Sequence, residues 1–189
     1  MWIDKFVEFK SGSSAVAVKN VTLAEEHLHD HFPGFPVMPE SLMIEAMAQT
    51  AGILVGQVRN FEEKVILAKI KKAEFFDYVK PGDTLRLEAE IGSVAREAAS
   101  TSGRITLIRH ESPEQASRED LTKDTTPGPA ESQKLIAEID LMFSHIDQNL
   151  AGKKFPEENF VFSGSTFESL LRYLPSDSAG SSEHRSEQQ

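Results

Sequence analysis

Residues 39–57, "PESLMIEAMAQTAGILVGQ", constrain the fold more than any other stretch of the chain. Pro39 suits the first turn of a helix, and Gly56 suits its end. Between them the apolar residues fall on every face of the helix: Leu42, Met43, Ile44, Ala46, Met47, Ala48, Ala51, Ile53, Leu54 and Val55. A helix that is apolar all round is buried by other structure. The sequence therefore predicts a central helix wrapped by the rest of the chain.

The segments around this helix have the period of β-strands, in which side chains alternate between two faces. Two of them, 5–9 and 14–21, flank "SGS" and are typical of a hairpin. Four more follow the helix: 65–70 running on toward Phe75, 84–94, 104–110 and 134–146. The predicted fold class is α+β, with an antiparallel sheet of five or six strands curved around the central helix.

The domain organisation follows from where this patterning stops. One domain is expected over residues 1–148, interrupted at about 110–133 by a polar segment with three prolines and no apolar period, typical of a mobile loop. Residues 149–175 form a C-terminal extension. Within it Ser165 begins a capping box, and an amphipathic helix is predicted over 166–174, packed on the domain or placed as a lid. Residues 176–189 are expected to be disordered.

Composition excludes several classes of function. The net charge of −10 argues against nucleic acid and anionic membranes, both of which select basic surfaces. The absence of cysteine excludes disulfides, thiol nucleophiles and cysteine-bound zinc. No apolar run approaches the roughly 20 residues of a membrane span, and the N-terminus does not resemble a signal peptide. A cytoplasmic location is expected.

Two side chains stand out for their chemistry. Glu45 lies in the middle of the apolar helix, where loss of water would disfavour the charged form and leave a carboxyl group able to act as an acid. The alternative is that Glu45 lies on a polar seam or pairs with a lysine. His31 precedes a Phe-Pro-Gly turn, and an imidazole can take up a proton near neutral pH. The helix start between them offers free backbone N–H groups.

"HFPGFPVMPESLMIEAMAQTAG", residues 31–52, resembles the signature of the 3-hydroxyacyl-acyl-carrier-protein dehydratases, a family with the hot-dog fold. That signature reads His-Phe-Pro-Gly-x-Pro-Val-Met-Pro-Gly, followed by a helix that carries Glu in an Ile-Glu-Ala-Met-Ala-Gln context. The resemblance continues more weakly through "KIKKAEFFDYVKPGDTLRLEAEI", residues 69–91. It covers roughly the N-terminal half, and the strand at 134–146 fits the fold.

The resemblance implies a lyase that converts (3R)-hydroxyacyl thioesters to trans-2-enoyl thioesters and water in fatty acid or lipid biosynthesis. His31 would abstract the α-proton and Glu45 would protonate the departing hydroxyl, the two coming from different protomers. The chain would form a homodimer or a trimer of dimers, need no cofactor or metal, and take its substrate on acyl carrier protein or coenzyme A. The implied substrate-binding residues are Phe32, Gly34, Val37, Met38 and Glu40.

One departure keeps other functions open. Glu40 stands where the family has Gly, at the first turn of the helix, where its carboxylate could crowd the thioester or repel developing negative charge. A non-catalytic acyl-thioester-binding hot-dog protein is therefore the main alternative. A hot-dog thioesterase is a third, in which Glu45 would activate water and His31 would have no role.

Two charged groups have further interpretations. "HLHDH" places His27, His29 and His31 at alternating positions, which could ligate zinc from one face of a strand, but no other cluster stands nearby to complete the site. Five lysines between residues 64 and 80 form the only local basic group, and they either bind the acidic acyl carrier protein or line a solvated strand edge. They are Lys64, Lys69, Lys71, Lys72 and Lys80.

Overall fold

The computed structural model describes residues 1–109, 132–146, 164–172 and 174. Most of the predicted loop at 110–133, the first part of the predicted extension and the predicted tail at 176–189 lie outside the described residues. The elements, in chain order, are β1 (Lys5–Lys10), β2 (Ser14–Asn20), α1 (His27–Asp30), α2 (Glu40–Gln57), β3 (Lys64–Phe75), β4 (Thr84–Val94), β5 (Ala98–Arg109), β6 (Ser132–Ile146) and α3 (Gly164–Leu171).

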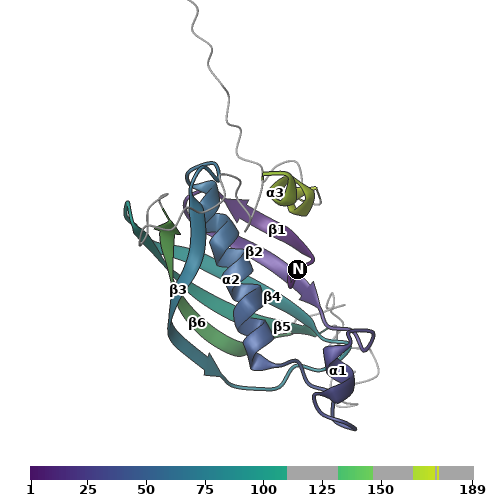
Figure 1. The fold of residues 1–189 in the computed structure, drawn as a ribbon. Helices are drawn as coiled ribbons and strands as arrows, with labels where there is room; N and C mark the ends of the chain where they lie inside the picture. Colours follow the sequence, from purple (N-terminus) through teal and green to yellow (C-terminus); the bar gives the residue numbers. More distant parts are fainter. Residues whose placement is uncertain (110–131, 147–163, 173, 175–189) are drawn as a thin grey trace, which may run out of the picture.

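The strands form one six-stranded sheet in the order β1-β2-β4-β5-β6-β3. Every neighbouring pair is antiparallel. Figure 1 shows this sheet curving around α2, which crosses its inner face. The predicted α+β class and the antiparallel sheet around a long helix are confirmed.

Apolar side chains, which alternate along each strand with more polar ones, line the inner face of the sheet. On β4, Leu85 and Leu87 are buried, while Arg86 and Glu88, which alternate with them, face outward. On β6, Ile139 is buried in the same way. The core lies between these side chains and the buried face of α2. At Gly103 of β5 the helix and the sheet approach so closely that any Cβ would meet the side chain of Met47.

Two elements differ from the prediction. Strand β5 begins at Ala98, six residues before the predicted start, because "AASTSG" lacks apolar alternation and is held in the sheet by β4 and β6 on either side. Helix α1 was not predicted, since four residues, "HLHD", have no period to detect.

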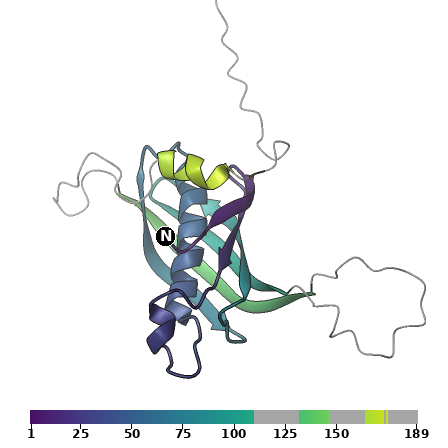
Figure 2. The same cartoon turned by 90° about the vertical axis from the view of Figure 1, so that its right-hand side faces the viewer.

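Helix α3 packs beside β1, at the end of α2 far from the α1 loop (Figure 2). Its Phe167 ring contacts the rings of Phe9 and Phe61, with centroids 5.0 and 5.3 Å apart. Leu170, one turn further on, is 5% exposed. In this position α3 covers the edge of the core.

Candidate active site

One face of α2 is only partly covered by the sheet. Glu45, Ala48, Gln49 and Gly52 recur there at helical spacing, and they line a hollow of about 190 Å³ together with residues of β3 and β6. The opposite wall is apolar and includes Val65, Leu67 and Phe143. The hollow therefore presents one carboxylate and one amide against an apolar wall, which is the composition expected of a pocket that orients a largely apolar ligand.

Glu45 lies at the mouth of this hollow and is exposed. Its Oε1 accepts a hydrogen bond of 2.8 Å from Nε2 of Gln49, one helical turn away. The prediction that burial removes Glu45 from water is wrong within this chain, because the hollow between α2 and strands β3 and β6 leaves Glu45 exposed. Within the single chain, the carboxylate remains in contact with solvent.

His31 directly follows α1, at the start of the loop that leads to α2, and its ring is held by the backbone. Its Nδ1 lies 2.9 Å from the carbonyl oxygen of Val37. A carbonyl oxygen can only accept, so Nδ1 carries the hydrogen and the neutral ring keeps its lone pair on Nε2. The ring also stacks on Phe32, with centroids 4.2 Å apart. The histidine is therefore held as the tautomer that can act as a base through Nε2.

The Phe-Pro-Gly sequence forms a tight turn directly after this histidine. The backbone groups of Phe32 and Phe35 bond to each other in both directions, at 3.1 and 2.9 Å, and Gly34 between them has φ +77°. That backbone region favours glycine because a Cβ would be strained there. The turn then sends the chain back so that Val37 N–H donates to the carbonyl of His31.

The other predicted substrate-binding residues fall in two environments. Val37 and Met38 are each 3% exposed and belong to the core, whereas Phe32 is 55% exposed. Glu40 is exposed on the first turn of α2, and Pro39 before it provides no side-chain cap. The first N–H groups of the helix are thus left without a side-chain cap beside the His31 turn. Contact of these residues with an acyl group stays a prediction.

The structure does not bring every candidate into one cavity. The hollow on α2 is lined by Glu45 but not by His31. Gln49, which bonds the candidate acid, was not among the predicted site residues. Its spacing of four from Glu45 on a helix was the available signal, since residues at i and i+4 are neighbours.

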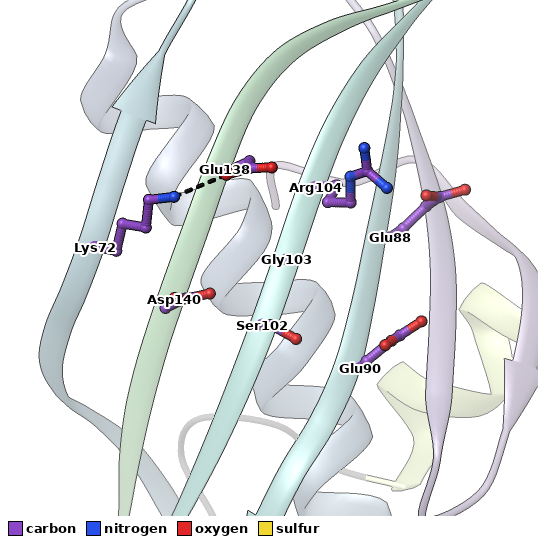
Figure 3. A pocket seen from close by; sticks show the side chains of 8 residues that line it. All are labelled: Lys72, Glu88, Glu90, Ser102, Gly103, Arg104, Glu138 and Asp140. Atoms are coloured by element: carbon purple, nitrogen blue, oxygen red, sulfur yellow. Dashed lines mark hydrogen bonds and ion pairs between the residues drawn. The ribbon is translucent and has the colours of Figure 1, made fainter.

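A second hollow, of about 300 Å³, lies on the sheet face turned away from α2. Figure 3 shows its walls, where charged side chains stand on β3, β4, β5 and β6 in front of the helix. Lys72 donates to Glu138 at 2.7 Å, and this hydrogen bond raises the pKa of Lys72 and lowers that of Glu138. Much of the charge here is paired, and neither His31 nor Glu45 is part of this surface.

The structure also bears on the predicted zinc site at His27, His29 and His31 and on the predicted basic group of five lysines. Segment 27–30 is a helix, so its histidines do not alternate on a strand face. Within the described ranges, no group of three or more His, Cys, Asp or Glu is placed to hold a metal. The five lysines do not share one surface: Lys64 is 7% exposed, Lys72 lies on the outer sheet face, and Lys80 covers the Phe35 ring at 4.6 Å.

Fold and site together define a hot-dog protein with a histidine, His31, before its central helix and a glutamate, Glu45, on that helix. Residues 1–108 match the family model described as a FabA-like domain, and the chain belongs to that family. No helix in the described part of the chain is long and apolar enough to cross a membrane.

Comparison with curated proteins points to one branch of this family. The chain is 42% identical over 106 residues to the 3-hydroxyacyl-[acyl-carrier-protein] dehydratase FabZ of Thermomicrobium roseum, a match that covers 56% of this chain and 71% of that protein. It is 45% identical over 106 residues to FabZ of Thiobacillus denitrificans, covering 54% of this chain and 73% of the relative. The resemblance noted in residues 31–52 is confirmed.

Solved structures of more distant proteins share the fold. A variant of an acyl-CoA hydrolase from Staphylococcus aureus in complex with coenzyme A has a TM-score of 0.51 at 16% identity, covering 81% of this chain and 76% of that one. An apo-hexameric acyl-CoA thioesterase has a TM-score of 0.50 at 16% identity, covering 76% and 74%. At such identity these similarities describe the fold alone.

Proposed function

We propose that this chain is a hydro-lyase that converts (3R)-3-hydroxyacyl thioesters to trans-2-enoyl thioesters and water, in fatty acid or lipid biosynthesis and in the cytoplasm. The strongest structural support is His31, whose ring is held by Val37 so that Nε2 keeps its lone pair. The FabZ relatives carry the same activity in their names. The substrate would be linked to acyl carrier protein or coenzyme A, and the reaction needs no cofactor.

The proposed reaction is an elimination of water that begins at C2, the carbon next to the thioester carbonyl. Nε2 of His31 takes the proton from C2, and the electron pair of that C–H bond becomes the C2–C3 double bond. The C3–O bond breaks, and the oxygen leaves as water after it receives a proton from the carboxyl group of Glu45. The thioester oxygen gains enolate charge on the way, which backbone N–H groups near Gly34 and the start of α2 would stabilise.

Geometry favours a site shared between two copies of the chain. Glu45 lines a hollow that His31 does not line, and the hollow lies beside β3, the last strand of the sheet. This edge strand exposes Leu67 and Ile70, 37% and 44% accessible. An exposed apolar edge strand can pair with another chain. In such a dimer His31 of one copy would face the hollow of the other, and the partner would remove water from Glu45.

Hydration of a short trans-2-enoyl thioester, followed by loss of its ultraviolet absorbance, tests the activity. Wild-type protein should turn the substrate over, and His31→Ala and Glu45→Gln should each lower kcat by roughly 100- to 10,000-fold. Release of free thiol in place of hydration would indicate a thioesterase. Absence of turnover with every chain length on both carriers would favour the non-catalytic binding protein.

Co-expression of the two inactive variants tests the shared site. If His31 and Glu45 meet across a dimer, a heterodimer of the His31→Ala and Glu45→Gln chains has one intact site and one site that lacks both groups. Activity should therefore reappear in the mixed species, purified with two different tags. A heterodimer as inactive as its parents would show that each chain builds its own site.

A further inference from the structure

A chain of two hydrogen bonds links the N-terminal segment to the candidate acid. The backbone N–H of Trp2 donates to Oε1 of Gln49 at 2.7 Å. The other end of that amide, Nε2, donates to Oε1 of Glu45 at 2.8 Å. Trp2 and Gln49 are 47 positions apart in the sequence. The Gln49 side-chain amide therefore connects the N-terminal segment to the carboxyl group of Glu45, which the proposed reaction uses.

The first of these bonds determines which way the Gln49 amide faces. A backbone N–H can only donate, so the amide oxygen must face Trp2 and the NH₂ group must face Glu45. A carboxyl oxygen that accepts from this NH₂ group keeps its lone pair for that bond. The transferable proton of a protonated Glu45 is therefore carried by Oε2, the oxygen that Gln49 does not contact.

The reversed amide would have the opposite effect. Its oxygen would face Glu45 and accept the acid proton, so the group that should protonate the substrate would donate to Gln49 instead. Its NH₂ group would then face the N–H of Trp2, leaving two donors opposed and a backbone donor unsatisfied. Such a mismatch is costly where water has limited access. The Trp2 N–H thus opposes the one orientation of Gln49 that would withdraw the proton.

The N-terminal segment is held firmly enough to do this. Ile3 is 3% exposed in the core, and the backbone N–H of Asp4 donates to Val18 at 2.8 Å. The Asp4 carboxylate accepts from the backbone N–H of Asn20 at 2.7 Å. The Trp2 indole packs edge-on against His27, with ring centroids 5.2 Å apart. The donor is therefore held from the C-terminal side of its peptide group, by the Trp2 ring and by the two residues that follow it.

We propose that Gln49 is a positioning residue for the general acid, and that the backbone N–H of Trp2 sets its orientation. This inference rests on the proposed function, in which Glu45 delivers the proton to the departing hydroxyl. Neither Gln49 nor Trp2 touches the reacting atoms in this scheme. Their effect is to keep one carboxyl oxygen occupied as an acceptor and the other free to hold the proton that is transferred.

Proline at position 2 removes the donor, and alanine retains it. Trp2→Pro and Trp2→Ala both delete the indole, so the ratio of their rates isolates the backbone N–H when an N-terminal extension keeps Met1 in place on both proteins. We expect kcat of Trp2→Pro to be roughly tenfold below that of Trp2→Ala, with KM within about twofold. Gln49→Leu should lower kcat by roughly 10- to 100-fold. Gln57→Leu, a matched change near the end of the same helix, should leave kcat unchanged.

A double-mutant cycle separates positioning from a general loss of structure. If the Trp2 N–H acts through Gln49, the Pro-to-Ala ratio at position 2 should approach one when Gln49 is already Leu. A tenfold ratio that persists in the Gln49→Leu background would overturn the proposal. So would a Gln49→Leu variant that folds and keeps wild-type kcat.

A readout that does not depend on turnover distinguishes failure of this inference from failure of the proposed function. In protein with ¹⁵N-labelled glutamine, the side-chain NH₂ of Gln49, assigned by its loss in Gln49→Leu, should show a shifted and slowly exchanging proton. That signal should change in Glu45→Leu and Trp2→Pro but persist in Trp2→Ala. With an inactive wild type, this pattern would support the contact and reject the function. An exchange-averaged amide in the wild type would reject the contact itself.

Discussion

Helix α2 and the sheet lie close together at Gly103, and a single added methyl group there tests how the core is packed. A Cβ built at this position of β5 would lie 2.8 Å from Cε and 3.0 Å from Cγ of Met47. Carbon atoms attract each other best at about 3.5–4.0 Å, so these contacts are repulsive. Met47 is 1% exposed, which means that its side chain has little space into which it can move.

The expected loss of stability can be bounded from these contacts. Overpacking of a well-packed core costs about 1–3 kcal/mol. The flexible Met47 side chain favours the lower part of that range, since Met adapts to irregular space. Replacing Gly by Ala also restricts the unfolded chain, which returns about 0.4–1 kcal/mol. The difference of these two effects means that Gly103→Ala should lower the free energy of unfolding by about 0.5–1.5 kcal/mol.

Urea denaturation at one fixed protein concentration measures this change, because assembly would otherwise shift the apparent stability. Gly92→Ala is the matched control: this glycine is exposed on β4, and its Cβ would face the Ser100 hydroxyl at 3.1 Å. Shortening the opposing side chain should relieve the clash, so Gly103→Ala should cost much less in a Met47→Ala background. Equal costs in the two backgrounds, or a Gly103→Ala protein as stable as wild type, would refute the packing argument.

Three further predictions concern the site and the outer sheet face. Gly34→Ala should lower the free energy of unfolding by about 1–2 kcal/mol because φ is +77° there. Thermal unfolding measures this loss, and Gly34→Asn, which tolerates this backbone region better, should lose less. Glu40→Gln should raise kcat by removing charge near the developing enolate, whereas Glu40→Asp should not; equal rates would place the carboxylate away from the substrate. Lys72 holds the pKa of Glu138 below its ordinary value of 4.5, so the pair's contribution is present above that pH and is lost as the pH falls through the lowered value. Carbon-detected NMR titration should find the Glu138 pKa returning toward 4.5 in Lys72→Met, and an unchanged value would exclude the pairing.

Much of the fold could be predicted because its determinants are local. The alternation in 84–94 and 134–146 and the apolar run in 39–57 each identify an element from a few neighbouring residues. The motif around His31 could be recognised for the same reason, since turn, histidine and helix start are contiguous in the chain. Helix α1 was missed because its four residues are too few to show a period, and the early start of β5 was missed because β4 and β6 hold that segment in the sheet.

The amino-acid sequence by itself determined the α+β class, the central helix, the turn at Gly34 and the family to which the chain belongs. Only the tertiary structure decided which face of the helix the sheet covers, and it leaves Glu45 on the open face. It also decided that the N–H of Trp2 meets Gln49, a contact between residues 47 positions apart. The physical reason is that the periodicity of apolar residues indicates which side chains are buried, whereas the partner of a polar group depends on which distant segments the fold brings into contact.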